Sequence, residues 1–179
     1  MQTIHVNGYD MAYLDVGKGP PLVCVHGSLS DFRIWGAVIG PLSARHRVIA
    51  PSLRHFFPEH WDGVGDTYSI AQHVQDVITF IEKLGVGRVD LMGHSRGGHI
   101  SFRAAQRRPD LLRKLILAEP GGELDATLDR TKGLLPKVLH TLAAHVPDSR
   151  TEMIAGATHP MFEQSPQKYC DIVLEFLAG

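Results

Sequence analysis

The chain of 179 residues opens with two alternating apolar–polar segments that flank a tight turn. Apolar side chains alternate over residues 4–6 and 9–16, on either side of Asn7-Gly8. An Asn-Gly pair between such segments is typical of a two-residue hairpin turn, because both residues tolerate positive φ. The pattern predicts an N-terminal antiparallel hairpin.

From residue 22 onward, short apolar runs alternate with segments of helical periodicity. The continuous apolar run over residues 22–25 indicates a strand buried on both faces of a sheet. Further strands are expected over residues 47–50, 89–93, 114–118 and 151–155. Apolar residues recurring every three or four positions predict helices over residues 31–44, 70–84, 96–107, 134–146 and from 165 onward. This order predicts an α/β fold with a mostly parallel, twisted sheet flanked by helices.

Two of these helices carry boundary or breaking signals. Thr67 or Ser69 is expected to cap the helix over 70–84, which Gly85 ends. In the helix over 31–44, Gly40-Pro41 is expected to interrupt or kink the chain, because proline lacks the N–H that the helix needs.

The composition is that of an ordinary globular protein, with 44% hydrophobic and 21% charged residues. Lys and Arg number 18 against 19 Asp and Glu, so we expect neither a nucleic acid nor a membrane partner. The first residues lack a signal-peptide pattern, and the two cysteines, Cys24 and Cys170, lie in apolar patterns. We therefore expect a cytoplasmic protein without a disulfide framework. Its oligomeric state leaves no trace in the sequence.

Residues 93–97 read Gly-His-Ser-Arg-Gly and lie between a predicted strand and a predicted helix. In this context G-x-S-x-G is typical of a sharp turn that exposes the hydroxyl of its serine, here Ser95. The glycines are needed because side chains at those positions would collide across the turn. The helix N-terminus favours the negative charge that develops beside such a nucleophile.

Two further motifs accompany this turn: Val25-His26-Gly27-Ser28 ends an early strand, and Gly156-Ala157-Thr158-His159 follows the last. In this order the three motifs resemble those of the α/β-hydrolase superfamily. The resemblance implies a largely parallel sheet of eight strands, with residues 1–179 forming one core domain. It also sets this chain apart from haloalkane dehalogenases and epoxide hydrolases, which have an aspartate where Ser95 stands.

The resemblance further implies roles for single residues. Ser95 is the nucleophile and His159 the base that activates it. The N–H groups of Ser28 and Arg96 form the oxyanion hole. For the acid that orients His159, the chain offers Glu119 at the end of the strand over 114–118, with Asp125 and Asp129 as weaker alternatives.

Other side chains near these motifs are expected to border the substrate, namely His26, His94 and Leu29. We expect His26 also to brace the oxyanion loop, and the His94 ring to point away from the nucleophile. The Arg96 side chain either attracts a second carboxylate of the substrate or extends outward along its helix, and we prefer the latter. No metal-binding pair such as H-x-x-x-H and no nucleotide or flavin motif is present, so we expect no metal and no cofactor.

Family members usually carry a cap domain and a seventh strand, which are expected between about residues 122 and 134 but are absent from the sequence. The cap belongs to the molecule but is missing here, or it was deleted by design, or a natural variant lacks it. We prefer the first explanation, because loss of the seventh strand leaves the eighth without a hydrogen-bonding neighbour. Under this explanation, consecutive Cα atoms somewhere in this region lie much farther apart than about 3.8 Å.

Together these features predict a serine hydrolase that acts on small carboxylic esters, lactones or related carbonyl substrates through an acyl-enzyme. The alternative is a ligand-binding or receptor-like protein of the same fold with little or no turnover, because fold alone does not determine function.

Overall fold

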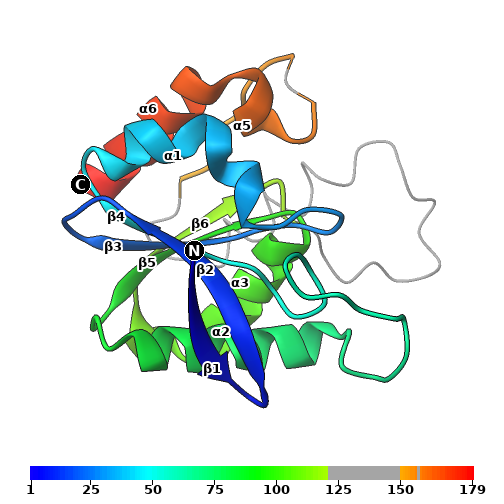
Figure 1. Ribbon diagram of the computed structural model, residues 1–179. Helices are drawn as coiled ribbons and strands as arrows, with labels where there is room; N and C mark the ends of the chain where they lie inside the picture. Colours follow the sequence, from blue (N-terminus) through cyan, green and yellow to red (C-terminus); the bar gives the residue numbers. More distant parts are fainter. Residues whose placement is uncertain (121–149, 157) are drawn as a thin grey trace.

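The computed structural model describes residues 1–120, 150–156 and 158–179, which form a six-stranded sheet between two layers of helices (Figure 1). One face is covered by α1 (Gly36–Ser43), α5 (Met161–Gln164) and α6 (Pro166–Ala178), the other by α2 (Ile70–Leu84) and α3 (Arg96–Arg107). This arrangement confirms the predicted α/β fold. No helix in the described part combines the length and apolar character needed to span a bilayer.

The sheet has the strand order β1-β2-β4-β3-β5-β6. The strands are β1 (Gln2–Val6), β2 (Tyr9–Val16), β3 (Pro21–Val25), β4 (Arg47–Pro51), β5 (Val89–His94) and β6 (Leu112–Ala118). The pairs β1–β2 and β2–β4 are antiparallel, and the remaining pairs are parallel. Asn7 and Gly8 have φ of 42° and 84°, so the predicted hairpin is confirmed.

Each face of the sheet has its own hydrophobic core. Under α2 and α3, residues such as Phe80 and Ile100 pack against the sheet, and on the opposite face Trp35, Phe162 and Tyr169 do so. Strand β3 is buried on both faces, as its continuous apolar run predicts. Cys24 and Cys170 are buried free thiols, so no disulfide joins them.

The helix boundaries agree with the sequence in part. Ser69 rather than Thr67 caps α2, by accepting a hydrogen bond from the Gln72 N–H, and Gly85 ends the helix with φ of 63°. The segment expected as one helix from residue 31 begins instead as a 3-10 helix over Phe32–Trp35, with Asp31 as its cap. Of the two effects expected of Gly40-Pro41, an interruption is wrong, because α1 contains Pro41 and continues to Ser43.

The predicted strand over residues 151–155 is also wrong. These residues form no strand, and β6 is the edge of the sheet among the described residues. A strand needs a neighbour for its N–H and C=O groups, and this segment has none in the described part of the chain. The predicted helix over 134–146 lies outside the described residues, as does the region expected to hold the cap, the seventh strand and the widened Cα spacing.

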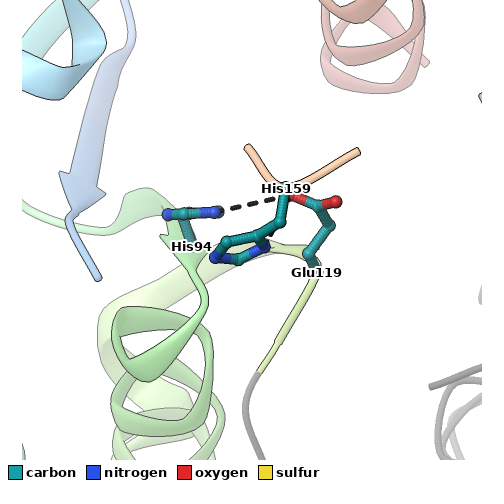
Figure 2. Close-up of side chains that lie close together, drawn as sticks. All are labelled: His94, Glu119 and His159. Carbon is teal, nitrogen blue, oxygen red and sulfur yellow. Dashed lines mark ion pairs between the residues drawn. The ribbon is translucent and has the colours of Figure 1, made fainter. Parts of the chain in front are cut away.

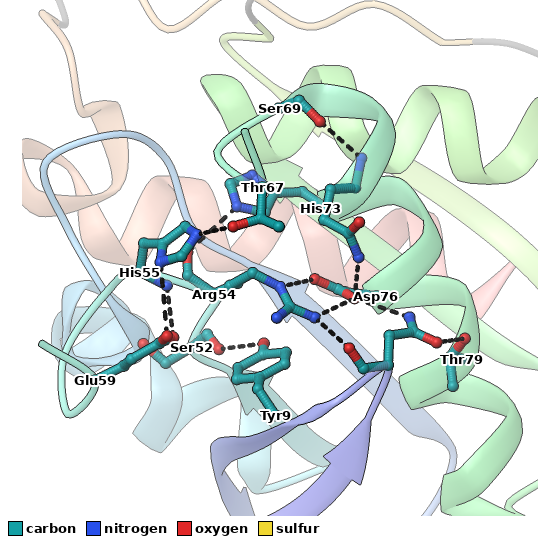
Figure 3. A network of polar contacts seen from close by, with 12 residues as sticks. Tyr9, Ser52, Arg54, His55, Glu59, Thr67, Ser69, His73, Asp76 and Thr79 are labelled. Carbon is teal, nitrogen blue, oxygen red and sulfur yellow. Dashed lines mark hydrogen bonds and ion pairs between the residues drawn. The ribbon is translucent and has the colours of Figure 1, made fainter. Parts of the chain in front are cut away.

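A polar network fixes the loop after β4 to α2 (Figure 3). The guanidinium of Arg54 donates to the fully buried carboxylate of Asp76, with Nε 2.9 Å from Oδ2. Asn7 and Gln72 donate to the same carboxylate at 2.8 and 2.9 Å. The buried charge is therefore both paired and hydrogen-bonded, which its burial requires. The loop positioned in this way includes Leu53, which supports the candidate active site.

Candidate active site

The turn between β5 and α3 has the strained geometry that its sequence predicts. Ser95 lies at φ 51° and ψ −120°, a conformation that costs a non-glycine residue on the order of 1–3 kcal/mol. Its N–H donates to the Ala118 carbonyl of β6 at 3.1 Å, which fixes the turn to the neighbouring strand. The hydroxyl therefore lies at the carboxyl edge of the parallel strands, at the start of α3.

The glycines around Ser95 are required by close backbone packing. A Cβ on Gly97 would collide with the carbonyl oxygens of Val25 and His26, and a Cβ on Gly93 would collide with Gly97. On Gly98, a Cβ would lie 2.8 Å from Pro120. The start of α3 therefore packs directly on the ends of β3 and β6, as the glycine pattern indicates.

Replacing Gly97 with alanine is expected to lower the free energy of unfolding by about 3 kcal/mol or more, because backbone atoms must move to admit the methyl group. Urea denaturation measures this change. The matched control is Gly36→Ala at the start of α1, where a Cβ meets nothing within 4 Å. We expect this control to change stability by less than about 0.5 kcal/mol or to raise it slightly. Equal stability of both variants would contradict the packing argument.

The loop after β3 lies directly against the nucleophile turn. A Cβ on Gly27 would lie 2.9 Å from Cβ of Ser95. Among the hydrogen bonds of the described residues, none comes from the backbone N–H of Ser28 or of Arg96. Both groups are therefore available as the donor pair that an oxyanion hole needs.

His26 braces this loop from inside the protein. Its ring is fully buried, with Nδ1 donating to the Gly27 carbonyl at 2.8 Å and Nε2 accepting from the Leu53 N–H at 2.9 Å. Because the ring is buried and both nitrogens are occupied, it has the position of a brace, and His26 does not line the pocket described below. Burial lowers the pKa of His26 to about 4, so the ring is neutral at pH 7.

This lowered pKa predicts a loss of stability in acid. Between pH 6.5 and 4 the unfolded chain binds a proton on His26 that the folded chain does not, so stability is full above pH 6.5 and falls on acidification. The loss from His26 alone is on the order of 3 kcal/mol near pH 4. His73 and His94, whose pKa values are also lowered to about 4, act in the same direction.

Urea midpoints measured from pH 7 to pH 4 test this prediction. The variant His26→Asn should be less stable at pH 7 but show a weaker dependence on pH. The same pH dependence in both proteins would contradict the assignment to His26.

Glu119 and His159 come together at the same edge of the sheet (Figure 2). Nδ1 of His159 lies 3.1 Å from Oε2 of Glu119, which also accepts the Met161 N–H at 3.1 Å. Glu119 follows β6 with φ of 46°, and its side chain is 17% exposed. Of the three candidate acids, Glu119 therefore has the geometry to orient His159, whereas Asp125 and Asp129 lie outside the described residues.

His94 lies beside this pair, contrary to expectation. Its ring stacks on that of His159, with centroids 4.4 Å apart, and its Nε2 lies 3.5 Å from Oε2 of Glu119. The expectation that this ring points away fails because the turn at Ser95 directs the preceding side chain toward Trp35 and Phe162, against which it packs edge-on. His94 is the residue before Ser95, and the His159 ring stacks on the His94 ring, so His159 lies next to the nucleophile turn.

An open pocket of about 500 Å³ borders these groups. Its lining includes His94 and His159, together with Ser28, Leu29, Ser30, Asp31, Arg33, Ile34, Pro160 and Glu163. Leu29 is fully exposed, with φ of 58°. No hydrogen bond joins Ser95 to His159 among the contacts of the described residues.

The side chain of Arg96 has a different place from either expectation. Its guanidinium lies over the Tyr68 ring, 4.4 Å from the centroid, and its Nη2 lies 3.5 Å from Nδ1 of His73. The side chain is therefore half-buried against the loop before α2, rather than extended outward, and it does not line the pocket beside His159.

Comparisons with known proteins agree with this fold. The family model of the alpha/beta hydrolase fold matches residues 20–169. A 2-hydroxy-6-oxo-2,4-heptadienoate hydrolase from Pseudomonas putida is 37% identical over 131 residues, which cover 69% of this chain and 47% of that protein. A soluble epoxide hydrolase from Corynebacterium sp. is 32% identical and covers 64% of this chain and 39% of that protein.

Solved structures show the same likeness. A thermophilic esterase from Thermogutta terrifontis has a TM-score of 0.60 and 30% identity, and the match covers 70% of this chain and 46% of the esterase. The aligned part of this chain thus spans less than half the length of each of these relatives. By name, the relatives hydrolyse different classes of substrate: an oxo-dienoate, epoxides and esters. On the match over residues 20–169, the chain belongs to the alpha/beta hydrolase fold family.

Proposed function

We propose that this protein is a serine hydrolase that cleaves small carboxylic esters, lactones or related carbonyl substrates through an acyl-enzyme. The observation that carries the proposal is the Glu119–His159 pair, 3.1 Å apart, beside the strained turn that presents Ser95. A carboxylate on Nδ1 holds the imidazole in the tautomer whose Nε2 accepts a proton, which is what a serine nucleophile requires.

The proposed reaction has two halves. Ser95 attacks the carbonyl carbon while Nε2 of His159 takes the hydroxyl proton, and the N–H groups of Ser28 and Arg96 stabilise the oxyanion. The proton then passes to the leaving group, which leaves an acyl ester on Ser95. A water molecule, deprotonated by the same imidazole, cleaves this ester and restores the serine. Substrate binding brings Ser95 and His159 into hydrogen-bonding distance, as catalytic contacts commonly tighten on binding.

Two observations bear on the substrate class. A serine at the nucleophile position favours carbonyl substrates over the epoxides and haloalkanes of relatives that use an aspartate there. Two relatives, an esterase and a hydrolase of an oxo-dienoate, act on such carbonyl compounds by name. We therefore include 2-hydroxy-6-oxo-2,4-heptadienoate with short esters and lactones as test substrates.

Covalent labelling tests the nucleophile directly. A fluorophosphonate is expected to add to one serine, and peptide mass spectrometry should find the adduct on Ser95. Ser43→Ala, which removes an exposed hydroxyl on α1, is the control and should label like the wild type. The absence of a Ser95 adduct, together with reversible binding of esters without turnover, would favour the ligand-binding alternative.

A further inference from the structure

We propose that His94, Glu119 and His159 form a zinc site, and that Zn²⁺ bound there switches off the base. Their ligating atoms come from three separate segments, β5, the end of β6 and the loop before α5, and lie within 4.8 Å of one another (Figure 2). Two imidazoles and a carboxylate are a set of three protein ligands that zinc takes when it keeps a fourth position open. The inhibition of hydrolysis by zinc rests on the proposed function, whereas the binding of zinc does not.

His94 supplies the strongest indication of a ligand. Its side chain is 3% exposed, yet neither ring nitrogen has a hydrogen-bond partner among the described residues. Leaving a buried polar atom unpaired costs about 1–3 kcal/mol, so such a group calls for a partner. Its Nε2 is directed toward the Glu119 carboxylate, where a metal ion would receive its lone pair.

The spacing of the ligating atoms is close to what zinc needs. Oε2 of Glu119 lies 3.5 Å from Nε2 of His94 and 3.1 Å from Nδ1 of His159. With zinc–ligand bonds of about 2.0–2.2 Å in a tetrahedron, neighbouring ligand atoms lie about 3.3 Å apart. Two of the three separations are therefore already within a few tenths of an ångström of the bound geometry.

To bind the metal, the His159 ring must rotate, and this is the side chain of the site that has space to do so. The rings of His94 and His159 are stacked at 27°, whereas both ring planes must contain the metal. His94 packs edge-on against the rings of Trp35 and Phe162, which stack on each other, while the side chain of His159 is 53% exposed. Turning His159 alone brings its Nδ1 toward the ion, and the open pocket beside both histidines leaves the fourth position to water.

Zinc at this site would remove the base by a change of tautomer. The metal takes the lone pair of His159 Nδ1, and the proton from that nitrogen moves to Nε2, so that Nε2 becomes a donor. An Nε2–H group cannot accept the proton of Ser95. The bound ion also takes the carboxylate of Glu119, which no longer stabilises an imidazolium.

Titration calorimetry with ZnCl₂ on EDTA-treated, dialysed protein tests the binding. We expect one equivalent to bind, and the variants His94→Leu and Glu119→Ala each to weaken binding more than about 100-fold, beyond the cost of losing only a supporting group. His5→Leu, which removes an exposed histidine paired with Asp10, is the control and should bind as the wild type does. Circular dichroism checks folding, and Co²⁺ absorption reports the ligand set if His94→Leu does not fold.

The outcomes separate this proposal from the proposed function. Wild-type affinity in a folded His94→Leu variant, no binding by the wild type, or a Co²⁺ spectrum without tetrahedral nitrogen ligation would each overturn the site. Zinc that binds there but leaves p-nitrophenyl acetate turnover unchanged would overturn the switch. Loss of turnover in proportion to occupancy, reversed by EDTA, supports it. Zinc binding in a protein that has no hydrolase activity even when metal-free would leave the site standing and refute the function.

Discussion

Replacing Ser95 with alanine is expected to lower kcat for p-nitrophenyl acetate by about 10⁴- to 10⁶-fold. Alanine removes the attacking oxygen, and the members of such a triad act as a unit, so the remaining groups do not compensate. What remains is the contribution of the oxyanion hole and of substrate binding. Initial rates with the two proteins at equal concentration measure the effect.

This variant has a useful structural property. Alanine has the same backbone restrictions as serine at φ 51°, so the strained turn and its contact with Ala118 stay as they are. The unfolding free energy should therefore change little, and Ser43→Ala controls for the loss of a hydroxyl elsewhere. Turnover within tenfold of the wild type would show that Ser95 is not the nucleophile, which would refute the proposed acyl-enzyme.

Much of the fold follows from local patterns in the sequence. The hairpin at Asn7-Gly8, the buried run of β3 and the capped stripe of α2 are each determined by residues near one another in the chain. The nucleophile turn belongs to the same group, because Gly93 and Gly97 are required by packing within one strand–turn–helix unit. For such units the sequence contains almost all the relevant information.

The errors arise where a distant partner decides the outcome. Residues 151–155 have the apolar character of a strand, but pairing depends on a neighbour that the described residues do not provide. The direction of the His94 ring is instead a local error: Ser95, next to it in the chain, turns the backbone out of the strand conformation, which the alternation of side chains along a strand does not predict. For His26, the sequence does not show that Leu53 supplies the second hydrogen bond, because that loop is positioned by Arg54 and Asp76.

Removing the side chain of Glu119 is expected to lower kcat on the order of 10⁴-fold, the scale of losing the triad acid. Glu119→Gln should lose less, about 10²- to 10³-fold, the scale of one electrostatic contact to the charge of a transition state. One atom makes both contacts: Oε2 lies 3.1 Å from His159 Nδ1 and accepts a hydrogen bond from the Met161 N–H. The amide oxygen of glutamine satisfies both donors, so the tautomer of His159 is kept and only the charge that stabilises the imidazolium is lost.

The order of the two variants therefore distinguishes orientation from charge. Steady-state kinetics with p-nitrophenyl acetate measure both, with Glu82→Ala as the control, since that exposed carboxylate on α2 pairs with Arg108 far from the site. If glutamine lost as much as alanine, charge would be the whole contribution of Glu119. If Glu119→Ala kept kcat within tenfold of the wild type, a different carboxylate would serve as the acid, and Asp125 and Asp129 would be the next residues to replace.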